Sequence, residues 1–117
     1  MYGWRALIGL IEPTGGPMLQ AEVRSAAPEG VSFVGSRMYI ETVDLKGIEG
    51  MVQHVERCGR DLAIMKADCA VLCGTPAGFF RGHAGNREVT ERLRGASGLS
   101  CMTQISAVVE GLRRLNC

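Results

Sequence analysis

The sequence predicts an α/β domain in which a four-stranded, mostly parallel sheet has helices on both faces. Two observations predict this fold class. Short apolar runs alternate along the chain with longer segments whose apolar residues recur at helical spacing. One of the short runs, Ala67–Gly74, is apolar almost throughout, as expected of a central parallel strand that is covered on both faces. Alternating strands and helices imply βαβ units with right-handed crossovers.

The first half of the chain is expected to contain two strands and two helices. A strand is predicted at Arg5–Ile11, where the apolar run stops before a cluster of proline and glycine residues. A short helix follows at Met18–Ala26, and a second strand is predicted at Val31–Val34. The longest periodic segment, Leu45–Met65, has charged residues opposite its apolar ones and predicts one continuous helix.

The second half begins with the strand at Ala67–Gly74, after which a loop rich in glycine and proline is expected. Asn86 is the expected N-cap of the next helix, and Gly98 is placed to end that helix. A fourth strand is predicted at Leu99–Thr103, followed by a last amphipathic helix over Ile105–Leu115. The prediction is therefore four strands and four helices.

Composition limits both the size and the partners of the protein. The 117 residues make a single domain, residues 1–117, with 46% hydrophobic and 21% charged residues. Thirteen Lys and Arg balance twelve Asp and Glu, and only six residues are aromatic, so no nucleic-acid partner is expected. No apolar run approaches the roughly 20 residues of a membrane helix, so no membrane partner is expected either.

The cysteines and the start of the chain indicate a cytoplasmic protein. The residues after Met1 lack a basic region followed by a long apolar segment, which a secretion signal would have. The five cysteines form an odd set without CxxC spacing, which favours buried thiols over a disulfide framework or a zinc site. No metal or organic cofactor is expected.

Ligand-binding loops in a parallel sheet follow the carboxyl ends of the strands. Here these loops are Glu12–Pro17, Tyr39–Val43, Gly74–Gly82 and Thr103–Ser106. The third loop is the most distinctive, because its glycines let backbone approach a ligand and Thr75 supplies a hydroxyl and an N–H group. Such donors suit an anionic oxygen. The alternative is an ordinary turn from strand to helix, and the usual phosphate-binding motifs are absent.

Three groups of residues, in this order and spacing, resemble the arylmalonate decarboxylase and maleate cis-trans isomerase branch of the aspartate/glutamate racemase superfamily. They are Ile8–Ile11 with Pro13, Gly74–Thr75 with Phe79–Gly82 and Asn86, and Gly98–Cys101 with Ser106–Val108 and Gly111–Arg113. The resemblance implies the flavodoxin-like N-terminal half of a two-lobed fold. The active site then lies between the lobes. The second lobe supplies the catalytic tyrosine and cysteine, so no catalytic residue is expected in this half.

The resemblance also implies a set of substrate-binding residues. Gly74 and Thr75 match positions that bind a substrate carboxylate, and Ile40 and Val43 match an apolar wall. Pro13 belongs to the loop at the mouth of the site. The racemases and isomerases have a cysteine where this chain has Gly74, so the glycine favours decarboxylation. The neighbouring Cys73 should point away from the site into the core, because successive strand side chains alternate between faces.

Three residues depart from the pattern of the family. Pro76, another of the predicted substrate-binding residues, stands where the decarboxylase has a serine, and proline supplies neither a hydroxyl nor an N–H group. Glu12 occupies an apolar position, and a carboxylate there is expected to point outward because it would repel an anionic substrate. Thr14 replaces a second proline of the mouth loop.

The sequence therefore leads to one main hypothesis and two alternatives. The main one is the N-terminal lobe of a cofactor-independent decarboxylase of a malonate-type acid, inactive without its second lobe. The alternatives are a maleate isomerase or racemase lobe, and a non-catalytic carboxylate-binding module. The expected partners are a small carboxylic acid and either the second lobe or a second copy of the chain, which would cover the sheet edge expected after Leu115. His54, His83 and Arg81 are expected on the surface.

Overall fold

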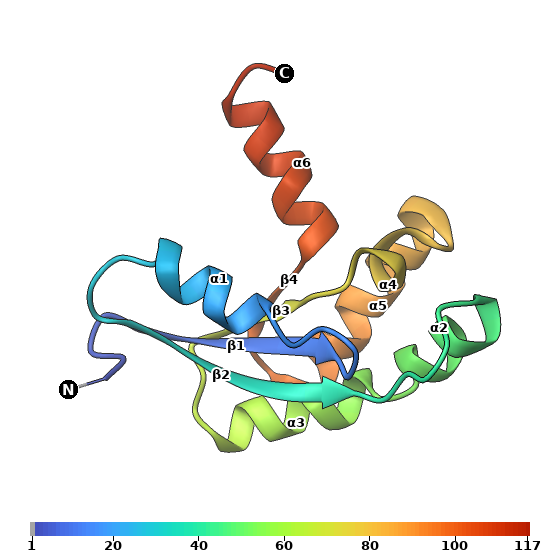
Figure 1. Ribbon diagram of the computed structural model, residues 1–117, viewed down its shortest axis with the longest axis horizontal. Helices are drawn as coiled ribbons and strands as arrows, with labels where there is room; N and C mark the ends of the chain where they lie inside the picture. The colour runs from blue at the N-terminus through green and yellow to red at the C-terminus, as the bar shows by residue number, and fades with distance from the viewer. Residues whose placement is uncertain (1) are drawn as a thin grey trace.

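A parallel sheet in the order β2-β1-β3-β4 forms the centre of the computed structural model (Figure 1), which describes residues 2–117. Its strands are β1 (Ala6–Pro13), β2 (Val31–Met38), β3 (Cys69–Leu72) and β4 (Ser100–Thr103). All three neighbouring pairs run parallel, and Ile8 of β1 pairs with Phe33 of β2 and Cys69 of β3. This architecture confirms the predicted fold class.

Six helices are found in the described residues, two more than predicted. They are α1 (Leu19–Ala26), α2 (Leu45–Val52), α3 (Val55–Ile64), α4 (Thr75–Phe79), α5 (Gly82–Ser97) and α6 (Gln104–Arg114). Helices α1 and α3 lie on opposite sides of the sheet, whereas α6 extends away from it (Figure 1). None of the helices in the described part combines the length and the apolar character that crossing a membrane requires.

The segment predicted as one long helix over Leu45–Met65 is two helices. The break falls at Gln53 and His54, whose N–H groups donate to Gly50 and Met51, three residues earlier. This tighter turn changes the direction of the helix axis. The apolar spacing continues across the turn, since Val52 of α2 and Val55 of α3 are both buried. For that reason the periodicity of the sequence did not reveal the break.

The loop predicted over Gly74–Gly82 is also partly helical. Thr75–Phe79 forms the short helix α4, and α5 begins at Gly82, four residues before the predicted N-cap Asn86. Asn86 is therefore not an N-cap, and its side chain instead bonds Thr103 at the end of β4 and Ser106 in the first turn of α6. Gly98 does end α5, with a left-handed φ of 69° that favours glycine.

The main core lies between the sheet and helices α3 and α5. Its fully buried members include Ile11, Leu72, Leu62 and Leu93. Gly9 allows α3 to approach the sheet, because a Cβ atom there would lie 2.6 Å from Cδ1 of Leu62. The core therefore fixes the central strands, and the carboxyl ends of those strands in turn position the loops of the candidate site.

Candidate functional site

The candidate site is built where the four parallel strands end at the same edge of the sheet. Pro13 ends β1, Met38 ends β2 and Thr103 ends β4, whereas β3 leads through Cys73 to Gly74. The segment after each strand therefore starts from the same side of the molecule. The loops predicted from the sequence as ligand-binding segments all begin there.

Gly74 and Pro13, two of the predicted site residues, lie in direct proximity. Gly74 has φ 98° and ψ 97°, a conformation that residues with a side chain rarely adopt. A Cβ atom at this position would lie 2.9 Å from Cγ of Pro13 and 3.3 Å from its Cδ. A glycine is therefore required here by both the backbone conformation and the neighbouring proline ring.

Gly74, Thr75 and Pro76 are the predicted substrate-binding residues of this turn, and only the first two carry hydrogen-bond donors. Gly74 N–H donates to Oε1 of Gln104 at 2.9 Å, so this donor already has an acceptor. Thr75, which starts α4 and is half-buried, has an N–H group and a hydroxyl without an acceptor in residues 2–117. Pro76 follows and adds no N–H group. Two donors of Thr75 are thus available for an anionic oxygen.

A polar network at the end of β4 fixes the start of α6. Thr103 is 1% exposed, and its hydroxyl contacts Oδ1 of Asn86 at 2.7 Å and Oγ of Ser106 at 3.0 Å. Nδ2 of Asn86 donates to the same Ser106 oxygen at 2.9 Å. Thr103 is also the N-cap of α6, since its side chain accepts from Ser106 N–H. These bonds place the next residue, Gln104, beside Gly74.

Sequence reasoning did not identify Gln104 as a site residue. The only signal available was its position in Thr103–Ser106, one of the loops after a predicted strand. The contact with Gly74 depends on β3 and β4 being neighbours in the sheet, which the linear pattern does not specify.

Ile40 and Val43, the two predicted wall residues, differ in their surroundings. Ile40 is half-buried against the core, and its backbone N–H and C=O both bond the Thr14 hydroxyl, at 3.0 and 2.9 Å. Thr14 therefore ties the loop after β1 to the segment after β2. Val43 is 80% exposed, and its place in an apolar wall stays a prediction.

Glu12 does not point outward as expected, because its side chain is only 1% exposed. Arg37 lies opposite Glu12 in the register of β1 and β2, and its Nη2 contacts Oε2 of Glu12 at 2.9 Å. The guanidinium group offsets the cost of burying the carboxylate. Oε1 of Glu12 has no partner in the described residues. The sequence alone did not show that Arg37 would face Glu12 across two paired strands.

Arg37 also holds the loop that follows β1. Its Nη1 donates to the carbonyl oxygens of Pro13 at 3.1 Å and Gly16 at 3.0 Å. The ion pair with Glu12 orients the guanidinium group for these two bonds. Glu12 and Arg37 together fix the backbone around Pro13, and Pro13 in turn packs against Gly74.

Cys73 is buried, as predicted for a core residue. Burial, together with the nearby Glu12 carboxylate, raises the pKa of its thiol to about 12. The thiol therefore remains protonated at neutral pH and is not a ready nucleophile.

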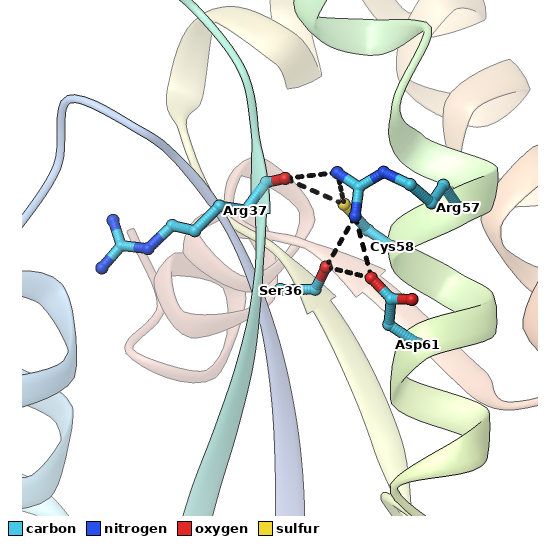
Figure 2. A network of polar contacts seen from close by, with 5 residues as sticks. All are labelled: Ser36, Arg37, Arg57, Cys58 and Asp61. Atoms are coloured by element: carbon cyan, nitrogen blue, oxygen red, sulfur yellow. Dashed lines mark hydrogen bonds and ion pairs between the residues drawn. The ribbon is translucent and has the colours of Figure 1, made fainter.

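A second polar network joins the edge strand β2 to α3 (Figure 2). The Arg37 carbonyl accepts from Nη2 of Arg57 at 2.6 Å and from the Cys58 thiol at 3.4 Å. Ser36 and Arg57 both contact Oδ2 of Asp61, at 2.7 and 2.9 Å. Figure 2 shows the Arg37 side chain pointing away from this network, so Arg37 links the network to the loop after β1.

Within residues 2–117 no group of three or more His, Cys, Asp or Glu side chains is arranged to hold a metal ion. His54 is partly buried at the turn between α2 and α3, and His83 is exposed near the start of α5. Arg81 is exposed and pairs with Glu49 at 3.3 Å. None of these three side chains is bonded to the turn at Gly74.

A family model and a curated protein that match the sequence of this chain carry the same description. The sequence model of the family described as arylmalonate decarboxylase matches residues 8–117. Arylmalonate decarboxylase of Bordetella bronchiseptica is 32% identical over 108 residues, which are 92% of this chain and 45% of that protein. The chain thus spans about half the length of the curated relative it matches.

Solved structures show the same relationship. A mutant arylmalonate decarboxylase in its liganded form has a TM-score of 0.83 at 30% identity, covering 95% of this chain and 47% of that one. A Nocardia farcinica maleate cis-trans isomerase mutant with a covalently bound succinylcysteine intermediate has a TM-score of 0.85 at 25% identity, covering 95% and 49%. A Pseudomonas putida maleate isomerase with maleate has a TM-score of 0.86 at 24% identity, a likeness of fold, covering 95% and 49%.

Proposed function

The chain belongs to the arylmalonate decarboxylase family, and from this premise we propose that residues 1–117 are the N-terminal lobe of a decarboxylase of malonate-type acids. The observation that supports decarboxylation most directly is the turn at Gly74. It provides the free donors of Thr75 for a carboxylate, and the Cβ atom of a nucleophilic cysteine at this position would lie 2.9 Å from Cγ of Pro13. We propose that the reaction proceeds without a metal or an organic cofactor.

The proposed reaction breaks one carbon–carbon bond. One carboxylate of the substrate leaves as carbon dioxide, and the electron pair of the broken bond is delocalised onto the remaining carboxylate as an enediolate. Neutral N–H and O–H donors such as those of Thr75 stabilise the added charge of that enediolate. A proton then adds to the carbon to give a monocarboxylic acid.

The proton donor is assigned to the second lobe, where the resemblance to the family places a cysteine. Cys73 is unsuited to the role, because it is buried and its pKa is raised to about 12. By this assignment the 117-residue chain binds substrate but does not turn it over.

We propose that the apolar side of α6 contacts this second lobe. Val108, Val109 and Leu112 are exposed along α6, as is Leu115 directly after it, whereas Ile105 is half-buried near Gly78 of α4. A groove of about 640 Å³ lies beside the stripe, lined in part by Phe79, His83, Val109 and Arg113. Exposed apolar residues that continue along one side of a helix indicate a contact surface. A second copy of the chain is the alternative occupant.

A maleate isomerase or racemase lobe remains the second candidate function. The similarity in fold to the Nocardia farcinica maleate isomerase supports it. Gly74 argues against it, because these enzymes are expected to use a cysteine at that position. A non-catalytic carboxylate-binding module is the third candidate. We also propose a cytoplasmic location, which the free cysteines support, because free thiols persist in a reducing compartment.

The decisive experiment compares the 117-residue chain with the complete reading frame from its native source. Both are incubated with phenylmalonate and with maleate, and carbon dioxide release and isomerisation are measured. We expect the longer protein to release carbon dioxide from phenylmalonate and the short chain to release none. Isomerisation of maleate by the longer protein would favour the second candidate. Saturable binding of phenylmalonate without turnover by either protein would favour the binding module.

A further inference from the structure

Gln104, the first residue of α6, presents its side-chain amide beside the turn at Gly74. Its Oε1 accepts from the Gly74 N–H at 2.9 Å. A backbone N–H can only donate, so the amide oxygen must face it and the orientation of the amide group is fixed. Nε2 is bonded to the same carbon as Oε1, and therefore the NH₂ group also lies beside this turn.

The NH₂ group of Gln104 is free to bind a ligand. It has no acceptor in residues 2–117, where Glu12 Oε1 is the only fully buried side-chain nitrogen or oxygen atom without a hydrogen-bond partner. The amide is therefore reached by solvent, and Gln104 as a whole is half-buried. Its backbone is held by the N-cap at Thr103, and its amide is held by Gly74. Little conformational freedom would be lost when a ligand binds to it.

The proposed anion site at this turn offers fewer hydrogen-bond donors than a carboxylate can accept. Gly74 N–H is already bonded, and Pro76 has no N–H group, which leaves the N–H and hydroxyl of Thr75. A carboxylate has two oxygens that accept about four hydrogen bonds. The NH₂ group of Gln104 is a neutral donor, and it lies beside the same turn as Thr75.

We propose that Gln104 is a substrate-binding residue that donates through Nε2 to a carboxylate oxygen of the substrate. It supplies a donor where Pro76 supplies none, and its Oε1 holds the turn in place at the same time. This inference rests on the proposed function, because it assigns a further residue to the same carboxylate site.

The test uses a substitution that separates the two roles of the amide. Gln104→Glu keeps an oxygen acceptor for Gly74 N–H but replaces the NH₂ donor with a second carboxylate oxygen. Gln104→Met removes both. Gln53→Glu is the matched control, because it adds the same charge at an exposed glutamine between α2 and α3. Binding of phenylmalonate is followed by NMR titration of the Gly74 and Thr75 amides, and stability is followed by thermal unfolding.

We expect Gln104→Glu to unfold at the same temperature as the unmodified chain and to bind phenylmalonate at least tenfold more weakly. The loss should persist in 1 M salt, where the screening length is about 3 Å and distant repulsion is suppressed. Gln104→Met should also weaken binding, and Gln53→Glu should not change it.

Two results would overturn the inference in different ways. If the unmodified chain binds phenylmalonate and Gln104→Glu binds it equally well, Gln104 only supports the turn and the proposed carboxylate site stands without it. If the unmodified chain shows no saturable shift of the Gly74 and Thr75 amides, the carboxylate site itself is wrong and the inference falls with it.

Discussion

The side of the molecule where α3 and α5 pack against the sheet differs from α1 and α6 in how deeply its side chains are buried. The first is closed by fully buried side chains such as Ile11, Leu62 and Leu93. By contrast, neither α1 nor α6 contains a buried residue among those that the structure describes. Figure 1 shows α6 extending away from the sheet. The difference indicates that α3 and α5 stabilise the domain, whereas α6 presents a surface suited to a further contact.

The largest expected effect is a cavity in the closed face. Leu62 is 0% exposed and fills the space above Gly9. Leu62→Ala is expected to lower the free energy of unfolding by about 3 kcal/mol, because it removes buried contacts and leaves a void. Leu115→Ala, at a residue that is 74% exposed, should change it by less than about 0.5 kcal/mol. Urea denaturation followed by circular dichroism measures both. Equal losses would contradict the distinction between the two regions.

A smaller effect is expected at the turn of the candidate site. Gly74→Ala is predicted to destabilise the chain by about 2 kcal/mol, because φ is 98° and the new Cβ atom would contact the Pro13 ring. Gly50→Ala in α2 is the matched control. A Cβ atom there meets nothing within 4 Å, and alanine favours a helix over glycine by about 1 kcal/mol. Thermal unfolding should therefore move in opposite directions for the two variants. A neutral Gly74→Ala would show that the turn does not require glycine.

An ion pair between α3 and α5 is expected to make the stability of the domain depend on pH. Nε and Nη2 of Arg92 contact the two oxygens of Glu56 at 2.6 and 3.0 Å, and this hydrogen bonding lowers the pKa of Glu56. A lowered folded-state pKa stabilises the fold above the ordinary value of the carboxyl, and the stabilisation is lost as pH falls through the lowered pKa.

Glu56→Gln is therefore expected to cost about 1 kcal/mol at pH 7 and progressively less in acid. Urea denaturation at a series of pH values between 7 and 3 measures the difference. Glu110→Gln, which breaks the exposed pair with Arg114 on α6, should have a much smaller effect at every pH. A cost at Glu56 that stays constant with pH would show that the pair does not lower its pKa.

The smallest effect on the stability of this chain is expected on the apolar side of α6. Leu112→Ser changes a half-exposed residue and should alter the free energy of unfolding by no more than about 0.5 kcal/mol. In the longer protein the same change should cost about 2 kcal/mol, because the second lobe would bury the leucine there. Comparing the two unfolding midpoints tests the proposed contact. Equal small effects in both proteins would show that α6 does not contact the second lobe.

Several features were predictable because they depend on residues close together in the sequence. The apolar run around β3, the glycine that ends α5 at Gly98 and the stripe of α6 all follow from local periodicity or local backbone preference. Gly74 was proposed as a site residue because it matches a carboxylate-binding position of the family that the sequence resembles, an assignment that stays a prediction. Its requirement for glycine was seen only when Pro13 was found beside it.

The features that sequence reasoning missed depend on contacts between distant segments. Glu12 was expected to point outward, and its burial followed from the pairing of β1 with β2, which sets Arg37 opposite it. Asn86 has the residue type of an N-cap, but Thr103 and Ser106 bind its side chain. The break between α2 and α3 was hidden because both helices turn their apolar residues to the same core.

The α/β class, the alternation of strands and helices, and the position of Gly74 after a central strand could all be predicted from the sequence alone. These follow from hydrophobic periodicity and from glycine and proline, whose influence extends over a few residues. The pairing of polar groups, by contrast, is visible only in the folded chain, where Glu12 meets Arg37 and Gly74 meets Gln104. Those pairs join strands and loops far apart in the chain. Their contact is set by the order and register of the sheet, which no local pattern specifies.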